Sequence, residues 1–552
     1  MQDLEGLLGK KAPRDKDGLN RLVAYVKGDV ESVDEQTGAV NIEVKDSNHP
    51  GIWSVEGVAR ALRGFLGVSP PRPLRVSGQS SLKVVVDKRL QPIRPFIACA
   101  VVRGVHPSEE ALKSWINLQE KMDQTYGRKR RKASIGLYQA DLIRSPLHYT
   151  VRDPEATTFV PLGSSEGMSL QRILEEHPRG QEYGSIISSF DNWPLLVDGK
   201  SQVLSLPPII NSNDLGRITT STRNILVEVT GTSLETVHNT LKIMVLALAE
   251  RRGRIFSCMQ TYGYKPTRTV TPDLGGRPAN VSLDYMNRVL GTSLDPSDAV
   301  RYLKRAGYGA RLAKRGEIAV QVPPYRLDIM HPVDLVEDVA IALDLNNLKP
   351  EWPKVWTPGG LSAETEAEDT VAEVMLGLGY QEVLTYSLTS PDVLARKMNA
   401  EPGRWAELAN PRMTTHTVLR NWLLPSLLEF MSANTHVDYP QRIFEVGPCE
   451  RLDGGNGGKI ETVSKLAGAT IHATAGFTEI RACMDALLKS LGLESTVQPE
   501  THPSFLEGRC GSVMINGRRI GLLGELTPRV VAAWGLSLPA AAFELEVGGL
   551  NA

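Results

Sequence analysis

A cluster of carboxylates between residues 328 and 338 is the clearest candidate for metal chemistry. Its members are Asp328, Asp334, Glu337 and Asp338. If a helix begins at Pro332, which suits a first helical turn, three of them share one face and Asp328 folds back from the preceding loop. Hard cations such as Mg²⁺ take oxygen ligands, so this spacing predicts a magnesium site. The alternative needs no metal, because the helix dipole stabilises acidic side chains at a helix start by about 0.3 to 1 kcal/mol.

A second candidate is the polar segment between residues 206 and 232. It combines a Pro207-Pro208 pair with small hydroxyl and amide side chains. Those of interest are Asn211, Ser212, Thr222 and Asn224. Such residues would line a stiff, polar pocket. They equally satisfy backbone groups at turns and strand ends, and the pattern leaves both interpretations open.

The third candidate is the basic run from Arg128 to Lys132, which follows a helical pattern over residues 109–125. A charge run of this kind is usually a solvated loop or helix end, although it also fits a nucleic-acid contact. The net charge of the chain is only −1, so nucleic-acid binding would depend on local basic patches.

Several common chemistries are excluded by their missing motifs. Gly458-Lys459 resembles the end of a phosphate-binding loop, but Asp453 and Ile460 occupy positions that need glycine and Ser or Thr. No dinucleotide fingerprint or His-Glu-x-x-His is present. The five cysteines are scattered without metal-ligand spacing, so we expect neither disulfides nor a zinc site.

The elements that position these residues belong to a chain of 552 residues, which predicts several domains. Hydrophobic residues make up 41% and charged residues 23%, as in ordinary globular proteins. No apolar run approaches the roughly 18 residues of a membrane span, and the first residues lack an apolar signal core. We therefore expect a cytoplasmic location and no membrane partner.

The pattern divides the chain into four regions of an α+β multidomain protein. They are 1–85, 86–262, 263–348 and 349–552. The second alternates strand-like and helical runs, including a helical pattern at 234–250. The third opens with a strand-like run at 268–270, continues with helices and reaches a second strand-like run at 317–322. The fourth contains a strand-like run at 382–388 and predicts an antiparallel sheet with helices on one face.

These residues together resemble one family, the beta subunits of phenylalanine tRNA ligase in their archaeal and eukaryotic-cytosolic form. The landmarks, in chain order, are Asp46 to Gly57, Asp123 to Gly127, Glu176 to Gly180, Pro207 to Ser212, Asp328 to Asp338, Asn410-Pro411, Leu419-Arg420, Phe444 to Gly447, His502 to Arg509 and Gly524 to Leu526. Each is weak, but their order is specific and spans nearly the whole chain.

The resemblance implies an assembly of two alpha and two beta chains, in which the alpha subunit binds ATP and attaches phenylalanine to tRNA. The fourth region would then be a class II synthetase-like sheet without ligase activity. The sequence agrees with this expectation, since no Phe-Arg-x-Glu motif stands near Phe444 and no Gly-x-Gly-x-Gly-x-x-Arg run follows. Arginines of this kind stabilise charge on a transferring phosphoryl group.

The second region resembles the family's editing domain, which hydrolyses tyrosine wrongly attached to the phenylalanine tRNA. An apolar pocket alone rejects one added hydroxyl only weakly, so a separate editing step is physically reasonable. The resemblance makes Asn211, Ser212, Thr222 and Asn224 the editing-pocket candidates. Asn213 stands where the family has an acidic residue, which leaves the hydrolytic mechanism open.

The third region resembles the family's DNA-binding-like module. There, acidic residues matching Asp328, Asp334, Glu337 and Asp338 are associated with Mg²⁺ shared with the alpha subunit. His49 and Gly51 depart from the family's commoner residues in the first landmark.

Two rival functions remain open at this stage. One is a stand-alone RNA-binding or assembly protein that kept the fold without the ligase. The other is an independent aminoacyl-tRNA deacylase that uses only the second region.

Overall fold

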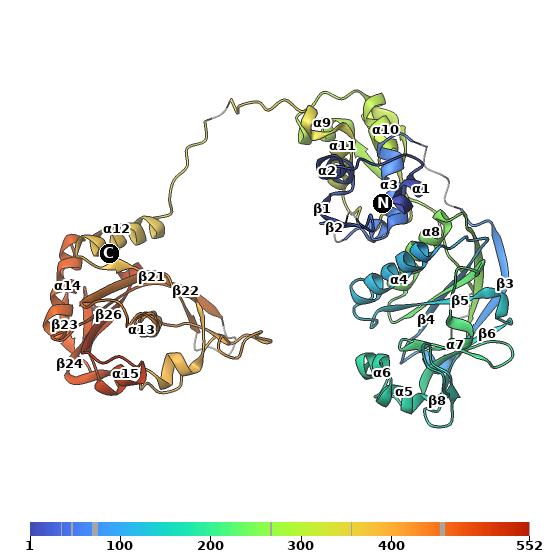
Figure 1. Ribbon diagram of the computed structural model, residues 1–552. Helices are drawn as coiled ribbons and strands as arrows, with labels where there is room; N and C mark the ends of the chain where they lie inside the picture. Colours follow the sequence, from blue (N-terminus) through green and yellow to red (C-terminus); the bar gives the residue numbers. More distant parts are fainter. Residues whose placement is uncertain are drawn as a thin grey trace. The chain divides into compact units, whose positions relative to one another are not determined.

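The computed structural model describes residues 1–34, 36–45, 48–68, 75–264, 268–354, 356–452 and 459–550 (Figure 1). Asp46 and Ser47 of the first landmark lie outside these ranges. The chain divides into two compact units, unit 1 (Met1–Glu351) and unit 2 (Trp352–Ala552). Among the described residues, no helix has both the length and the apolar character needed to span a bilayer.

The largest part of unit 1 is a ten-stranded sheet. Its strands in spatial order are β11 (Ile210–Asn211), β10 (Val203–Leu206), β9 (Trp193–Val197), β6 (Leu147–Arg152), β3 (Gly78–Val86), β13 (Arg254–Tyr262), β4 (Phe96–Arg103), β12 (Asn224–Gly231) and β5 (Ala133–Gln139), with β14 (Arg268–Thr271) paired to β13. Neighbours are antiparallel except where β3 meets β6 and β13. Strand β5 therefore ends this path with one edge free of strand partners among the described residues.

Two smaller modules complete unit 1. The helices of the unit are α1 (Gln2–Leu8), α2 (Lys16–Val23), α3 (Val55–Phe65), α4 (Glu109–Gln124), α5 (Leu170–Glu176), α6 (Pro178–Tyr183), α7 (Asn213–Gly216), α8 (Leu234–Glu250), α9 (Leu283–Leu290), α10 (Pro296–Arg305) and α11 (Pro332–Leu343). The N-terminal module adds the hairpin of β1 (Gly28–Val33) and β2 (Val40–Val44) to α1, α2 and α3. In the second module, α9 to α11 pack on a sheet ordered β15 (Arg277–Ser282), β17 (Glu317–Val322) and β16 (Gly309–Leu312). A short hairpin of β7 (Thr158–Phe159) and β8 (Met168–Ser169) precedes α5.

Alternation along β12 directs its side chains into two different cores. Val227 and Val229 pack beneath α4 and α8, which lie side by side on one face of the sheet (Figure 1). Leu226 joins the core on the opposite face. Glu228 shares that face and is buried, so it needs polar partners inside the protein.

The structure corrects two of the sequence-based boundaries. Strand β3 ends at Val86, so the boundary at 85/86 cuts through the ten-stranded sheet. The run at 268–270 forms β14, which pairs with β13 in the same sheet and does not open the third region. Both errors have one cause: local pattern detects a strand but not the sheet it joins.

Unit 2 is built on a seven-stranded sheet. In spatial order the strands are β18 (Gln381–Glu382), β21 (Gln441–Leu452), β22 (Ile460–Ile471), β26 (Ala540–Glu546), β25 (Arg518–Leu526), β24 (Phe505–Ile515) and β23 (Thr496–Pro499). All pairs are antiparallel except β18 with β21. A separate pair joins β19 (Leu388–Thr389) to β20 (Val418–Leu419). The predicted single strand at 382–388 is therefore wrong, because its two ends belong to different sheets.

Helices cover both faces of this sheet, which corrects the prediction of a one-sided arrangement. The helices are α12 (Ala363–Gly377) and α14 (Phe477–Ser490) on one face, and α13 (Leu424–Ala433) and α15 (Pro528–Ala533) on the other. The adjacent residues Ile443 and Phe444 show the cause, since they point to opposite faces and both are buried. A strand buried on both faces loses the alternation that sequence patterning depends on.

Candidate functional site

A cavity of about 390 Å³ lies in unit 1 beside β5, the last strand of the ten-stranded sheet. Its walls come from α4, β5, the end of α7 and the loop around the Pro207-Pro208 pair. The polar side chains of the wall are Gln119, Glu120, Arg130, Ser134, His177, Arg179, Ser205, Asn211, Arg217 and Glu228. A cavity of this size, whose wall mixes apolar and polar side chains about equally, suits a small polar ligand or the end of a larger one.

Tyr138 ties three polar groups of this wall together. Its hydroxyl lies 2.9 Å from Glu228 Oε2, 2.9 Å from Ser205 Oγ and 3.2 Å from Asn211 Oδ1. A phenol carries only one proton, so it donates to one acceptor at a time. Glu228 Oε1 is buried without a hydrogen-bond partner, which leaves one acceptor of the carboxyl unused.

Gly136 makes this arrangement possible. It lies opposite Glu228 in the register between β5 and β12. A Cβ at this position would overlap the Tyr138 hydroxyl and lie 2.5 Å from Glu228 Oε2. The missing side chain therefore provides the space in which the carboxyl and the phenol meet.

Burial raises the pKa of Glu228 to about 7, although the hydrogen bond from Tyr138 and the charge of Arg94 act to lower it. Arg94 is itself buried beneath the site and donates to Thr230 Oγ1 at 3.0 Å and Ser134 Oγ at 3.0 Å. Burial also raises the pKa of Tyr138 well above its usual range, so the phenol stays protonated. A carboxyl that titrates near neutral pH can exchange protons or accept a hydrogen bond from a ligand.

The structure brings one of the four predicted pocket residues to the cavity. Asn211 lines it, whereas Ser212 accepts a hydrogen bond from the backbone N–H of Leu215 at the start of α7. Thr222 accepts from the backbone N–H of Thr219 within a turn. Asn224 donates to Asp141 at 2.8 Å on the exposed side. The last three follow the turn and strand-end alternative that the sequence left open.

Sequence reasoning missed the two central groups, Tyr138 and Glu228. A signal for Glu228 exists, because it is the one charged residue within the otherwise apolar run of β12. A carboxylate inside a buried strand requires compensation and is a marker of a polar site. Tyr138 gives no such signal, since tyrosine is common in buried strands.

Two of the predicted metal ligands, Asp328 and Asp338, form ion pairs with a buried arginine. Arg326 is buried and binds Asp328 at 2.6 Å and Asp338 at 2.5 Å, and Tyr308 donates a hydrogen bond to Asp338. Helix α11 does begin at Pro332, as predicted. Asp328, which precedes this helix, and Asp338, which lies within it, therefore neutralise the positive charge of Arg326.

The other two carboxylates also have partners within the chain. Asp334 Oδ2 accepts from the backbone N–H groups of Met330 and His331 at 2.7 Å each, which caps α11. Glu337 is exposed and pairs with Lys27 at 2.8 Å. In the part of the chain that the structure describes, no three metal-binding side chains converge. As a set, the four carboxylates do not fit one Mg²⁺ within this chain.

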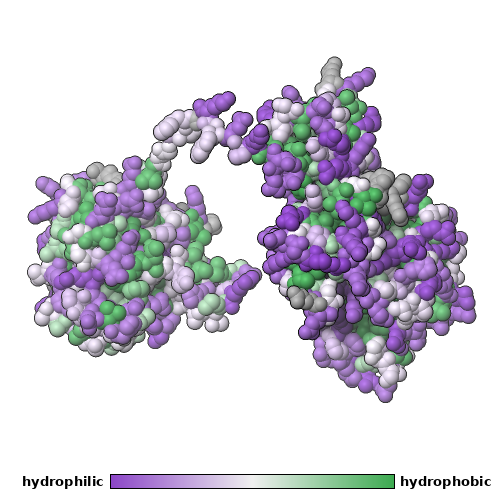
Figure 2. Space-filling view, turned by 45° about the horizontal axis from the view of Figure 1, so that its top comes forward, coloured by the Kyte–Doolittle hydropathy of each residue, from purple (hydrophilic) through white to green (hydrophobic). Residues whose placement is uncertain are grey.

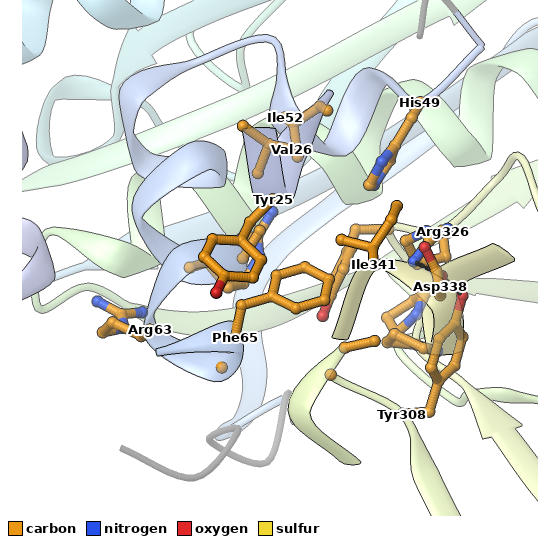
Figure 3. A pocket seen from close by; sticks show the side chains of 18 of the residues that line it. Tyr25, Val26, His49, Ile52, Arg63, Phe65, Tyr308, Arg326, Asp338 and Ile341 are labelled. Carbon is orange, nitrogen blue, oxygen red and sulfur yellow. Dashed lines mark hydrogen bonds and ion pairs between the residues drawn. The ribbon is translucent and has the colours of Figure 1, made fainter. Parts of the chain in front are cut away.

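The Arg326 cluster forms one wall of a cavity of about 410 Å³ between the N-terminal module and the three-stranded module (Figure 3). Tyr25 and Phe65 stack on another wall with ring centroids 5.4 Å apart. Burial and the nearby charge of Arg326 lower the pKa of His49 to about 3, so the imidazole is neutral. Because a neutral imidazole carries no charge to bury, His49 can occupy this buried position of the first landmark.

Comparison with known proteins gives matches along most of the chain. A family model described as "Phenylalanyl tRNA synthetase beta chain CLM domain" matches residues 348–547, and one described as "tRNA synthetase B5 domain" matches residues 279–344. The second match coincides with the module that contains α11.

Full-length relatives and a solved structure agree with these matches. The chain is 40% identical to the phenylalanine–tRNA ligase beta subunit of Thermococcus onnurineus, covering 98% of this chain and 96% of that protein. It is 40% identical to the beta subunit of Pyrococcus horikoshii, covering 98% and 97%. It is also similar to the crystal structure of an N-terminal fragment of the Pyrococcus horikoshii subunit, with a TM-score of 0.59, covering 62% of this chain and 97% of the fragment.

Proposed function

Because the chain belongs to the family of phenylalanine–tRNA ligase beta subunits, we propose that it completes this ligase by assembling with an alpha chain and editing mischarged tRNA. In this proposal two alpha and two beta chains form the enzyme, and the alpha chain attaches phenylalanine to tRNA with ATP. The similarity over 98% of the chain supports the subunit assignment. The assembly would act in protein synthesis in the cytoplasm.

Exposed apolar side chains of unit 2 support the alpha partnership. Leu384 and Tyr386 are each 82% exposed, and Trp352 and Trp356 even more so. Figure 2 shows green hydrophobic areas on the visible surface of this unit. Large exposed apolar groups of this kind mark surfaces that a protein partner covers.

Unit 2 would be a class II synthetase-like sheet that no longer catalyses ligation. Arg420 is buried and paired with Glu445 at 2.7 Å, and it also donates to the Thr385 hydroxyl. A guanidinium committed in this way is not available to stabilise a phosphoryl group. This pairing supports the assignment of ATP chemistry to the alpha chain.

Editing is the proposed task of the cavity beside β5. Tyrosine differs from phenylalanine by one hydroxyl, and the buried, unpartnered Glu228 Oε1 is suited to accept a hydrogen bond from it. Phenylalanine would leave this buried acceptor unsatisfied, which disfavours its entry. Asn211 and Ser205 would hold the water that attacks the ester, while the ribose oxygen leaves with a proton. The single observation that carries this proposal is the partnerless carboxyl oxygen in the cavity wall.

The test is to co-express the chain with the alpha chain of the same genome and measure phenylalanine attachment and tyrosine release. Both activities are expected in the complex, and Glu228→Ala should reduce tyrosine release at least tenfold without changing phenylalanine attachment. Asp141→Ala, outside the cavity, is the matched control. Charging without tyrosine release would remove the editing function. Failure to form a complex, with tyrosine release retained, would favour the independent deacylase, and loss of all activity the stand-alone RNA-binding protein.

Magnesium stays a prediction for the assembled enzyme. Glu337 is exposed and Asp334 is half-buried, whereas the side chains of Asp328 and Asp338 are buried against Arg326. Asp334 and Glu337 could therefore meet a cation together with ligands from the alpha chain. Such a cation would supply positive charge at the subunit contact. We expect Asp334→Asn with Glu337→Gln to weaken Mg²⁺ binding by the complex in a calorimetric titration, with Glu364→Gln as the control. Unchanged binding would contradict the prediction.

A further inference from the structure

The basic run between α4 and β5 adopts a backbone conformation that its side chains disfavour. Arg128, Lys129 and Arg130 are consecutive and have φ angles of 54°, 51° and 63°. Each non-glycine residue in the left-handed region costs roughly 1 to 2 kcal/mol, and glycine or asparagine would be the ordinary choice. The turn is kept by backbone hydrogen bonds, including Arg130 N to Asp123 O at 3.0 Å and Lys132 N to Gly127 O at 2.8 Å.

The turn separates the five basic side chains into one internal group and four external ones. Arg130 is buried, pairs with Asp123 at 3.1 Å and donates to the carbonyl oxygens of Pro208 and Ile209. It also lies over the ring of Tyr183 at 4.3 Å. Arg130 therefore fastens the loop that forms one wall of the cavity to the end of α4.

The other four side chains, Arg128, Lys129, Arg131 and Lys132, are exposed. Among the described residues, none of them has a side-chain ion pair or hydrogen bond with a carboxylate. The nearby acids are already used, since Asp123 and Glu120 pair with Arg130 and Arg179. The result is four neighbouring positive charges without internal compensation.

These charges lie at the edge of the cavity. Lys132 is two residues before Ser134, which lines the cavity. Arg130, which lies between Lys129 and Arg131 in the turn, lines the cavity as well. At about 3.3 Å per residue along an extended chain, the exposed side chains begin within roughly 10 Å of the wall. A nucleic acid whose end occupies the cavity would therefore pass close to these side chains.

We propose that Arg128, Lys129, Arg131 and Lys132 bind the sugar-phosphate backbone of a single-stranded RNA whose terminal nucleotide enters the cavity beside β5. The proposal rests on the editing function of that cavity and adds the surface that holds the nucleic acid. Residues in a disfavoured backbone conformation are concentrated at functional sites, because their side chains are kept for binding although they destabilise the fold. Arginine and lysine in this disfavoured backbone fit that description.

The test uses a change that separates binding from folding. Arg128→Gly with Lys129→Gly removes two charges and also relieves two left-handed residues, so the melting temperature should stay equal or rise. Binding of a fluorescent 12-nucleotide single-stranded RNA to the full chain is measured by anisotropy between 50 and 200 mM salt. Lys10→Ala with Lys11→Ala, an exposed pair in the N-terminal module, is the control with equal charge loss.

Each phosphate contact contributes about 0.7 to the slope of log affinity against log salt for single strands, so the glycine pair should lower the slope by about 1.4. If affinities converge at 1 M salt, binding at 0.1 M falls roughly 25-fold. An unchanged slope and affinity would overturn the proposal even if the complex releases tyrosine. Salt-dependent binding by the native chain that the glycine pair weakens as expected, without any tyrosine release by the complex, would support the RNA surface and contradict the editing function.

Discussion

A buried carboxyl in a β-strand is costly unless the protein offers it polar contacts, and Glu228 receives these from Tyr138 and the charge of Arg94. Even so, the desolvation cost dominates and its pKa rises to about 7 from an ordinary 4.5. The folded state then binds more protons than the unfolded state between these two values. The stability that Glu228 contributes is therefore complete below pH 4.5 and is lost as the pH rises through 7.

This predicts that Glu228→Gln stabilises unit 1 in a pH-dependent way. The neutral amide mimics the protonated carboxyl at every pH, so the variant should match the native chain near pH 4.5. Above pH 7 it should be more stable by up to roughly 3 kcal/mol, at 1.36 kcal/mol per unit of pKa difference. Urea unfolding at pH 4.5 and pH 8 measures the difference. A gap that does not change with pH would contradict the raised pKa of Glu228. Burial also raises the pKa of Asp123, to about 7, but Asp123 is present in both chains, so its titration cancels in the difference.

A second residue-scale prediction concerns Gly136. Replacing it with alanine places a methyl group where the Tyr138 hydroxyl and Glu228 Oε2 meet, and breaks their 2.9 Å hydrogen bond. We expect a loss of about 1 to 3 kcal/mol in the free energy of unfolding, because buried polar groups lose partners. Tyrosine release by the complex should fall with it. Gly167→Ala is the control, since its Cβ would meet no atom within 4 Å, and an equal effect there would refute the explanation.

The role of a residue could be predicted from the sequence only where its own chemistry favours one position in a helix or strand. Pro332 begins α11 as expected, because the ring fits a first turn. The partners of Asp328 and Asp338 were not predictable, since Arg326 is two residues from one and twelve from the other, and only the fold brings all three together. Tyr138 and Glu228 belong to strands ninety residues apart in the chain.

At the scale of elements, α11 is attached to its module through Arg326, which joins the loop before the helix to Asp338 within it. Arg326→Met should destabilise unit 1 by about 3 to 5 kcal/mol, because it leaves the carboxylates of Asp328 and the buried Asp338 without their positive partner. Denaturant unfolding followed by circular dichroism measures the change. Arg301→Met is the matched control: its ion pair with Asp298 is exposed, so its loss should cost far less than the loss of Arg326. Similar effects of the two substitutions would contradict this assignment.

Elements with strong periodicity were predicted closely, and those that depend on distant pairing were not. The helical pattern at 234–250 matches α8, and the pattern at 109–125 matches α4 to within one residue. The strand pattern at 317–322 matches β17. By contrast, the residues of β18 and β19 form short strands only because β21 and β20 lie beside them, and no local pattern encodes those partners.

At the scale of the whole molecule, the cavity beside β5 lies in unit 1 and the most exposed aromatic and aliphatic side chains lie in unit 2. Two separately folded units can serve two tasks because the residues for each task lie within one unit. The acidic cluster and the cavity beside β5 both lie within Met1–Glu351, so either can be tested without altering unit 2.

The exposed side chains of unit 2 give the last prediction. Leu384→Ser with Tyr386→Ser should weaken assembly with the alpha chain, because burying two large apolar side chains contributes at least about 3 kcal/mol, or roughly 100-fold in the dissociation constant. The melting temperature of the isolated beta chain should not change, since both side chains are already in water. Leu142→Ser with Val270→Ser, two exposed apolar residues of unit 1, is the control. Co-purification and sedimentation measure the assembly. Undiminished assembly would show that the alpha chain binds elsewhere, whereas a lower melting temperature would show that these side chains support the fold of unit 2 itself.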